Sequence, residues 1–217
     1  MASHSVTLRH HFETAEQQKD ASTIGMWLFL VTEIMFFGGM FMAYTAYRGA
    51  YPAAFAAGSE KLNVTLGLIN TIVLICSSLT MAMAVHFAAV GKKQLIVLFL
   101  ILTLCLGGVF LGIKTVEYGD KFAHHEVPGP HFEFAEGDAA HVSLYFAMYF
   151  GMTGLHALHM IIGACILLVL IVQSARGKYT PEWHTPVEMF GLYWHFVDIV
   201  WIFLFPLLYL IDLHPGK

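Results

Sequence analysis

Residues 95–113 read LIVLFLILTLCLGGVFLGI, a run of nineteen residues without one charged side chain. An α-helix rises 1.5 Å per residue, so this run covers most of the ~30 Å of hydrocarbon in a bilayer. It lacks the alternation of polar and apolar residues that marks the strands of a membrane barrel, and a helix is the other backbone form that satisfies its own polar groups in lipid. The stretch therefore predicts a membrane-spanning α-helix.

Four further segments of the chain have the same apolar character. We predict five transmembrane helices, at about residues 23–47, 62–90, 95–117, 141–174 and 187–211. The predicted fold class is all-α, a polytopic bundle of five transmembrane helices in a domain over residues 23–212, preceded by a polar segment at residues 1–22. The short link at 91–94 makes the second and third helices antiparallel neighbours.

The composition agrees with a membrane protein and excludes several other classes. Of 217 residues, 58% are hydrophobic and 12% are charged, against about one quarter charged in a soluble domain. A formal charge of -4 offers no basic face for nucleic acid. Cys76, Cys105 and Cys165 lie in apolar runs without the spacing of a zinc or redox site, so we expect buried thiols.

Basic residues retained on the cytoplasmic side set the direction of a membrane protein. Six lysines and arginines fall on the side of the N-terminus and of the loops at 91–94 and 175–186, and four fall on the opposite side, with Lys114 left out because it borders a span. We therefore expect a cytoplasmic N-terminus and an external C-terminus.

Glu33 is a carboxyl within the first predicted span. It lies ten residues into that span, on the order of 15 Å along the helix. A carboxylate at such depth costs ~2.5–3.5 kcal/mol on insertion scales, so the group must be neutral, paired or turned towards protein. Two interpretations stay open: a proton-exchanging or gating carboxyl, and a neutral acid that fixes helix packing through a hydrogen bond.

Four other polar residues lie at similar depth in the last two spans. His195 and Asp198 are three residues apart, so they share a helix face and can share a hydrogen bond, and His156 and His159 repeat this spacing in the fourth span. If the helices are rotated suitably, these residues and Glu33 form one intramembrane polar cluster, with Glu33 bonded to a histidine as its simplest version. Helix rotation is not readable from the sequence, so this convergence is a hypothesis.

Histidines inside a membrane also raise the question of haem or copper. Haems held between two helices in two layers would need histidines about four turns apart on each helix, and no predicted span has that pattern. The acidic loop at 119–140 carries His124, His125 and His131 at irregular spacing, which favours a solvated loop over a metal site. We predict no catalytic residue and no metal ligand in this chain.

Small residues allow membrane helices to approach each other closely. Gly108 and Gly112 form a GxxxG step in the third span, and Gly151, Gly154 and Gly163 lie along the fourth. These five glycines are candidates for helix packing, against the alternative that glycine is simply common in such helices.

Three motifs lie in the first, fourth and fifth predicted spans. EIMFFGG occupies residues 33–39, HALHMIIG residues 156–163 and YWHFVDIVW residues 193–201. They are similar to the SEVFFFAGFF stretch, the HGLHVIIG segment and the last-helix signature of subunit III of haem-copper terminal oxidases. The chain thus resembles the five-helix form of that family.

Further stretches extend the resemblance to the remaining spans. LINT at 68–71 and VEY at 116–118 match two more family segments in the expected order. The departures are Ala157 and Met160 in the fourth span, and Thr32 where the family usually has serine.

The resemblance implies a function and a set of partners. It implies a non-catalytic subunit that binds no haem or copper itself, packs against subunit I, keeps the oxidase intact during turnover and supports proton uptake. Haem and copper are then expected in partner subunits, and a structural phospholipid, other oxidase subunits and a respiratory supercomplex are compatible with this role. Glu33 corresponds to the family's carbodiimide-reactive buried carboxyl, and the expected location is the bacterial cytoplasmic membrane.

The identity of the electron donor is left open by these motifs. A cytochrome c oxidase is the first expectation, and a quinol oxidase subunit III or a homologue associated with nitric oxide reductase is the alternative. An alternative of another class is a self-contained proton-coupled carrier that uses Glu33, His195 and Asp198 as its relay.

Overall fold

The structure is a computed structural model that describes residues 12–129, 132 and 138–210, and its named elements are all helical. In chain order they are α1 (Ala15–Ala50), α2 (Pro52–Glu60), α3 (Val64–Val90), α4 (Lys93–Ala123), α5 (Ala139–Ala175), α6 (Thr185–Phe205) and the π-helix η1 (Pro206–Leu210). Five spans, formed by α1, α3, α4, α5 and the continuous α6–η1 segment, are long and apolar enough to cross a membrane. The prediction of a five-helix membrane bundle is confirmed.

The helix ends differ from the predicted ones where polar sequence continues a helix beyond the apolar run. α1 begins at Ala15 and not near residue 23, because the Thr14 hydroxyl accepts a hydrogen bond from the Gln17 amide at 3.1 Å and caps the helix. The predicted polar segment 1–22 therefore falls partly in α1 and partly outside the described residues. The short helix α2, which starts at Pro52, was not predicted.

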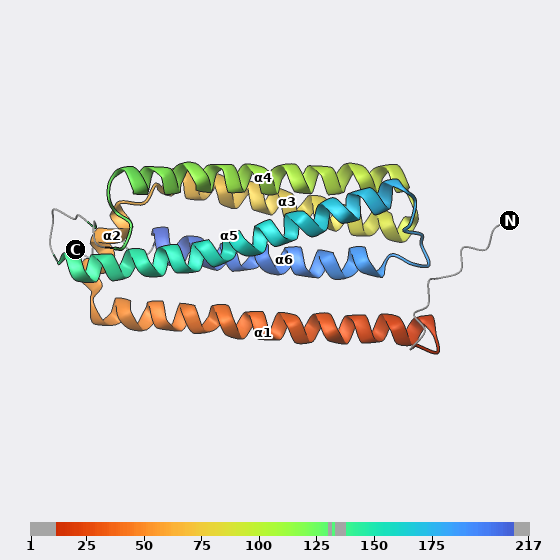
Figure 1. Ribbon diagram of the computed structural model, residues 1–217, viewed down its shortest axis with the longest axis horizontal. Helices are drawn as coiled ribbons and strands as arrows, with labels where there is room; N and C mark the ends of the chain where they lie inside the picture. Colours follow the sequence, from red (N-terminus) through yellow and green to blue (C-terminus); the bar gives the residue numbers. More distant parts are fainter. Residues whose placement is uncertain (1–11, 130–131, 133–137, 211–217) are drawn as a thin grey trace.

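The α3–α4 connection follows from one glycine. Gly91 ends α3 in the left-handed conformation with φ of 77°, which suits a residue without a β-carbon. α4 starts two residues later, and the two helices pack side by side along their lengths (Figure 1). The four-residue link thus makes them antiparallel neighbours, as the sequence predicts.

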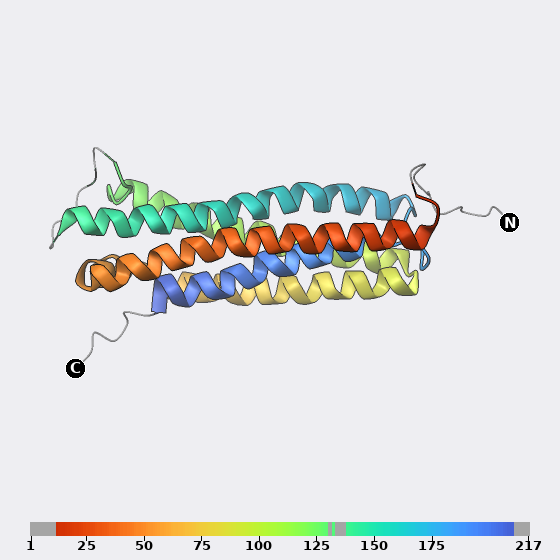
Figure 2. The ribbon, with the colours of Figure 1, turned by 90° about the horizontal axis from the view of Figure 1, so that it is seen from below.

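The last span, α6, is the centre of the bundle. It contacts α1, α3 and α5 and is the most buried of the five spans, whereas α1 is the least buried. Figure 1 shows α1 on the side of the bundle away from the α3–α4 pair, and Figure 2 shows it running lengthwise between α5 and α6. Two tryptophans of α6, Trp194 and Trp201, are fully buried and fill the core between α6 and its neighbours.

Of the five glycines predicted to pack helices together, only Gly163 lies at a close helix contact, and Gly107, which was not predicted, lies at another. A β-carbon added to Gly163 would lie 2.9 Å from the Trp194 ring, and one added to Gly107 would lie 3.1 Å from it. Added β-carbons at Gly108, Gly112 and Gly151 would meet nothing within 4 Å, and one at Gly154 only the Tyr118 hydroxyl at 3.9 Å. Gly108, Gly112 and Gly151 therefore do not serve packing within this chain, because the packed face of α4 is rotated by one residue from the GxxxG step.

The prediction of buried cysteine thiols is wrong. Cys76, Cys105 and Cys165 are exposed, not buried. Each lies on a helix face that no other part of the described chain covers, because an apolar run in a membrane helix faces lipid or a partner as readily as its own core.

Candidate functional site

The structure brings Glu33 of α1 against His159 of α5. The Glu33 carboxyl Oε2 lies 3.2 Å from His159 Nε2, and the two side chains are 19% and 14% exposed. Both residues lie near the middle of their helices, so the contact is deep in the span. We call this contact the Glu33–His159 pair.

The tautomer of His159 determines how many protons the Glu33–His159 pair holds. His159 Nδ1 lies 2.8 Å from the Leu155 carbonyl oxygen, which can only accept, so Nδ1 must donate. In a neutral imidazole Nε2 is then an acceptor facing another acceptor, the Glu33 carboxyl. The pair therefore needs one further proton, held either as a carboxylic acid or as an imidazolium, and it is neutral overall in both forms.

His156 makes a separate contact in the core between α5 and α6. It is fully buried, and its Nε2 donates to the Val197 carbonyl oxygen at 3.0 Å. Its ring packs against Phe110 and Trp201, with ring centroids 5.3 Å away in each case. This histidine tethers α5 to α6.

His195 and Asp198 lie on the side of α6 that faces α3. His195 Nδ1 is 2.7 Å from the hydroxyl of Ser78 on α3. The expected His195–Asp198 hydrogen bond is not among the bonds of the described residues, and the Asp198 oxygens make no hydrogen bond of good geometry there, although the Ser78 hydroxyl is near them. The hydrogen-bond partner of His195 is therefore Ser78 of α3 and not the predicted Asp198.

The five titratable groups do not form one cluster among the described residues, but the simplest version of the predicted cluster, Glu33 bonded to a histidine, is present as the Glu33–His159 pair. Glu33, His159, Ser78 and Asp198 all lie near the middles of their spans. They form contacts on different sides of α6 because the rotations of α1, α3 and α5 point them to different neighbours.

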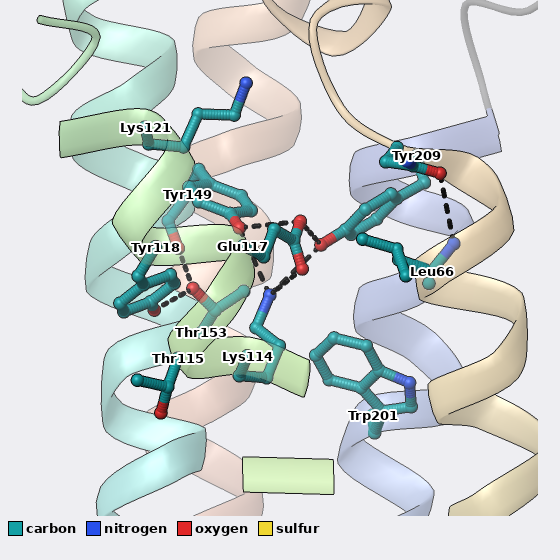
Figure 3. A network of polar contacts seen from close by, with 12 residues as sticks. Leu66, Lys114, Thr115, Glu117, Tyr118, Lys121, Tyr149, Thr153, Trp201 and Tyr209 are labelled. Carbon is teal, nitrogen blue, oxygen red and sulfur yellow. Dashed lines mark hydrogen bonds and ion pairs between the residues drawn. The ribbon is translucent and has the colours of Figure 1, made fainter. Parts of the chain in front are cut away.

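A buried polar network lies nearer the α4 end that leads to the 124–138 loop. The ammonium of Lys114 is 2.9 Å from Glu117 and 3.1 Å from each of the hydroxyls of Tyr149 and Tyr209. Both tyrosines donate to the other Glu117 oxygen, at 2.9 and 2.5 Å. Figure 3 shows the ion pair between the two tyrosine rings with Trp201 beside it. We call these residues the Lys114 network.

The Lys114 network fulfils the requirements of a buried ion pair. The Lys114 and Glu117 side chains are 4% and 3% exposed, and all three ammonium protons have an acceptor. The aromatic rings of Trp201 and Tyr118 lie 5.2 and 5.3 Å from the Lys114 nitrogen and stabilise its charge. The network ties α4 to α5 and to η1.

Lys114 was not predicted to be a site residue, because it borders a predicted span. The available signal was a lysine and a glutamate three residues apart with tyrosines in two other spans. The pairing between spans could not be read without their rotations.

An apolar groove runs between α1 and α6. It has a volume of about 500 Å³ and is lined mainly by side chains such as Ile34 and Phe41 of α1 and Ile199 and Phe203 of α6. Its dimensions and chemistry suit hydrocarbon chains. Phe37, one of its lining residues, contacts the His159 ring edge-to-face with the ring centroids 5.4 Å apart.

Potential metal ligands do not gather in the described part of the chain. No group of three His, Cys, Asp or Glu side chains there is close enough to hold a metal ion. His131 of the acidic loop lies outside the described residues. The location of haem and copper in partner subunits stays a prediction.

Comparison with known proteins identifies the family. The profile of the family described as cytochrome c oxidase subunit III matches residues 3–212. The chain is similar to cytochrome c oxidase subunit 3 of Thermostichus vulcanus, with 33% identity over 91% of this chain and 90% of the relative. For cytochrome c oxidase subunit 3 of Corynebacterium diphtheriae the identity is 34% over 88% of both chains. For quinol oxidase subunit 3 of Bacillus subtilis it is 32% over 88% of this chain and 87% of the relative. With these matches over nearly its whole length, the chain belongs to the cytochrome c oxidase subunit III family.

Proposed function

We propose that this chain is the non-catalytic subunit III of a respiratory haem-copper oxidase, in a complex that reduces oxygen and pumps protons. The observation that carries the proposal is the family match over residues 3–212, which includes all five spans. In this proposal the redox chemistry takes place in another chain, and haem and copper are bound there.

The internal contacts of the chain support a structural role. The Lys114 network has its charged groups satisfied by neighbours in the same chain. The Glu33–His159 pair holds α1, the least buried span, against α5 through one shared proton. These contacts make a stable scaffold, which is what a subunit that stabilises subunit I requires.

The chain's membrane setting and partners form part of the same proposal. We place it in a bacterial cytoplasmic membrane with a cytoplasmic N-terminus, packed against subunit I and supporting proton uptake. The groove between α1 and α6 would hold phospholipid acyl chains, because its lining is almost entirely apolar. Association with a respiratory supercomplex is compatible with the broad exposed apolar surface of α1.

The electron donor is proposed to be cytochrome c, with quinol as the second candidate. The relatives from Thermostichus vulcanus and Corynebacterium diphtheriae are named cytochrome c oxidase subunits, and the relative from Bacillus subtilis is named a quinol oxidase subunit. Oxygen consumption by the purified complex with reduced cytochrome c, and separately with a quinol, distinguishes the two.

A deletion experiment tests the non-catalytic role. Membranes from cells that lack this chain should retain the haem spectrum of subunit I and the initial rate of oxygen consumption, while activity declines faster during turnover. Activity that lasts as long as in the wild type would contradict the stabilising role. A haem absorption band that stays with the separated chain would contradict its non-catalytic assignment.

A further inference from the structure

A hollow between α3 and α6 contains polar groups at the middle of the membrane. It has a volume of about 280 Å³ and is lined by Ser78, His195 and Asp198 within an apolar border that includes Leu79 and Ile199. The border is open to the surroundings, since Leu79 is 65% and Ile199 50% exposed. This surface is distinct from the apolar groove between α1 and α6, although His195 and Ile199 line both.

Asp198 is the polar group of this hollow whose hydrogen bonding is incomplete. The residue is 3% exposed, and neither carboxyl oxygen makes a hydrogen bond of good geometry with the described residues, although the Ser78 hydroxyl is close enough to interact with it. The Ser78 hydroxyl is near the carboxyl and shares a hydrogen bond with His195 in which the imidazole tautomer sets the donor, and in either case a hydroxyl has a single proton to donate. Ser78 therefore cannot satisfy both oxygens of Asp198.

The depth of the hollow limits what can complete these bonds. Asp198 lies thirteen residues after Thr185, about 20 Å along the last span and near its midpoint. Lipid headgroups stay at the interface, and acyl chains carry no hydrogen-bond donor. A donor at this depth is supplied most readily by a side chain of another membrane helix, because polar residues in a span turn towards protein.

We infer that the hollow between α3 and α6 is the docking site for a transmembrane helix of another chain, which places a hydrogen-bond donor against Asp198, Ser78 and His195. The donor is a hydroxyl, amide, indole or cationic side chain, since the acceptor is a carboxyl. Identification of that other chain as the haem-bearing subunit rests on the proposed function. The inference that a membrane helix docks in the hollow does not depend on the proposed function.

Site-directed photocrosslinking in native membranes tests the docking surface. A benzophenone amino acid replaces Leu79, which lines the hollow and not the α1–α6 groove, and in a matched control it replaces Val109, which is 48% exposed on α4. After illumination of the intact complex, mass spectrometry identifies the adducts. We expect a transmembrane segment of another chain to be captured from position 79 at several times the yield from position 109.

The outcomes separate this inference from the proposed function. Capture of lipid alone from position 79, or of a second copy of this chain, overturns the docking site even if the haem-bearing subunit co-purifies. Capture of a membrane helix from a polypeptide that belongs to no oxidase complex upholds the docking site and contradicts the proposed function.

Variants of Asp198 test the hydrogen bond itself. Asp198→Leu removes the acceptors at similar size, and Asp198→Asn keeps one acceptor oxygen. We expect the partner to dissociate in detergent about tenfold faster from the leucine variant than from the wild type, with the asparagine variant in between. Equal dissociation of all three contradicts the inference. If the leucine variant does not accumulate in membranes, the dissociation rate of the partner is compared between the asparagine variant and the wild type. Equal rates for these two would again contradict the inference.

Discussion

The Glu33–His159 pair holds one proton between a carboxyl and an imidazole in the middle of the bilayer. The Nδ1 donation to Leu155 leaves Nε2 facing the carboxyl at 3.2 Å. Either location of the proton gives a neutral pair, which explains how a glutamate is tolerated at this depth. A role in proton transfer stays a proposal, and the geometry itself accounts for a tether between α1 and α5.

Chemical labelling tests the state of Glu33. A lipid-soluble carbodiimide attacks a protonated carboxyl, so it should label the wild-type chain at Glu33 and should not label Glu33→Gln. Glu60→Gln is the control because Glu60 is exposed and outside the spans. Peptide mapping by mass spectrometry locates the adduct. Undiminished labelling of the Glu33→Gln chain would show that the reactive carboxyl is elsewhere.

The Lys114 network makes a stronger prediction about stability. Lys114→Met leaves Glu117 buried without its cation, so the free energy of unfolding should fall by about 3–5 kcal/mol. The double variant Lys114→Met with Glu117→Gln should be less destabilised than the single one, because no unpaired charge remains. Denaturant titration in mixed micelles measures the free energy of unfolding of both variants. A double variant that is no more stable than the single one would refute a net cost from the unpaired carboxylate.

At the scale of elements, helix rotation determines which glycines matter. Gly163→Ala places a methyl group 2.9 Å from Trp194 and should destabilise the bundle by about 1–3 kcal/mol. Gly108→Ala is the matched control, since its methyl group meets no atom of this chain within 4 Å. Thermal unfolding of the detergent-solubilised protein compares them. Equal stability of the two variants would be incompatible with the observed packing of α5 on α6.

The first turn of α5 gives a pH-dependent prediction. A hydrogen bond from His141 holds the pKa of Asp138 below its ordinary value of 3.8, and Asp138 is the N-cap of α5. A carboxyl with a lowered pKa stabilises the folded form above the unfolded value, and this contribution is lost as the pH falls through the folded value. Hydrogen exchange of the first α5 amides should therefore be slow, relative to the intrinsic rate, at neutral pH and lose protection below about pH 3.8. Protection that is as strong in Asp138→Ala at neutral pH would exclude this cap.

The sequence predicted the five membrane-spanning helices because each span is a long apolar run, and it missed the short helix α2. It also located Gly91 in the turn between α3 and α4, since a glycine between two such runs ends a helix. It could not predict which residue of each helix turn faces inwards. Gly107 packs where Gly108 was expected to, and Ser78 bonds to His195 where Asp198 was expected to. In a membrane span both the core face and the lipid face are apolar, so the hydrophobic pattern does not distinguish the two faces.

At the scale of the whole molecule, the bundle is organised around α6 and is incomplete on its outer faces. α1 buries little of its surface, and the hollow between α3 and α6 leaves a carboxyl without sufficient donors. The orientation with a cytoplasmic N-terminus stays a prediction from the distribution of basic residues. A chain with satisfied internal networks and an unsatisfied outer face fits a subunit of a larger assembly.

We propose that this chain works as a part of an oxygen-reducing complex whose haem lies in another polypeptide. The most direct test is affinity purification of the chain from native membranes in mild detergent, with identification of the companions by mass spectrometry and a reduced-minus-oxidised visible spectrum. We predict a large haem-bearing partner in stoichiometric amount and no haem spectrum from this chain after separation. A chain that purifies alone, or one that retains haem when separated, would contradict the claim.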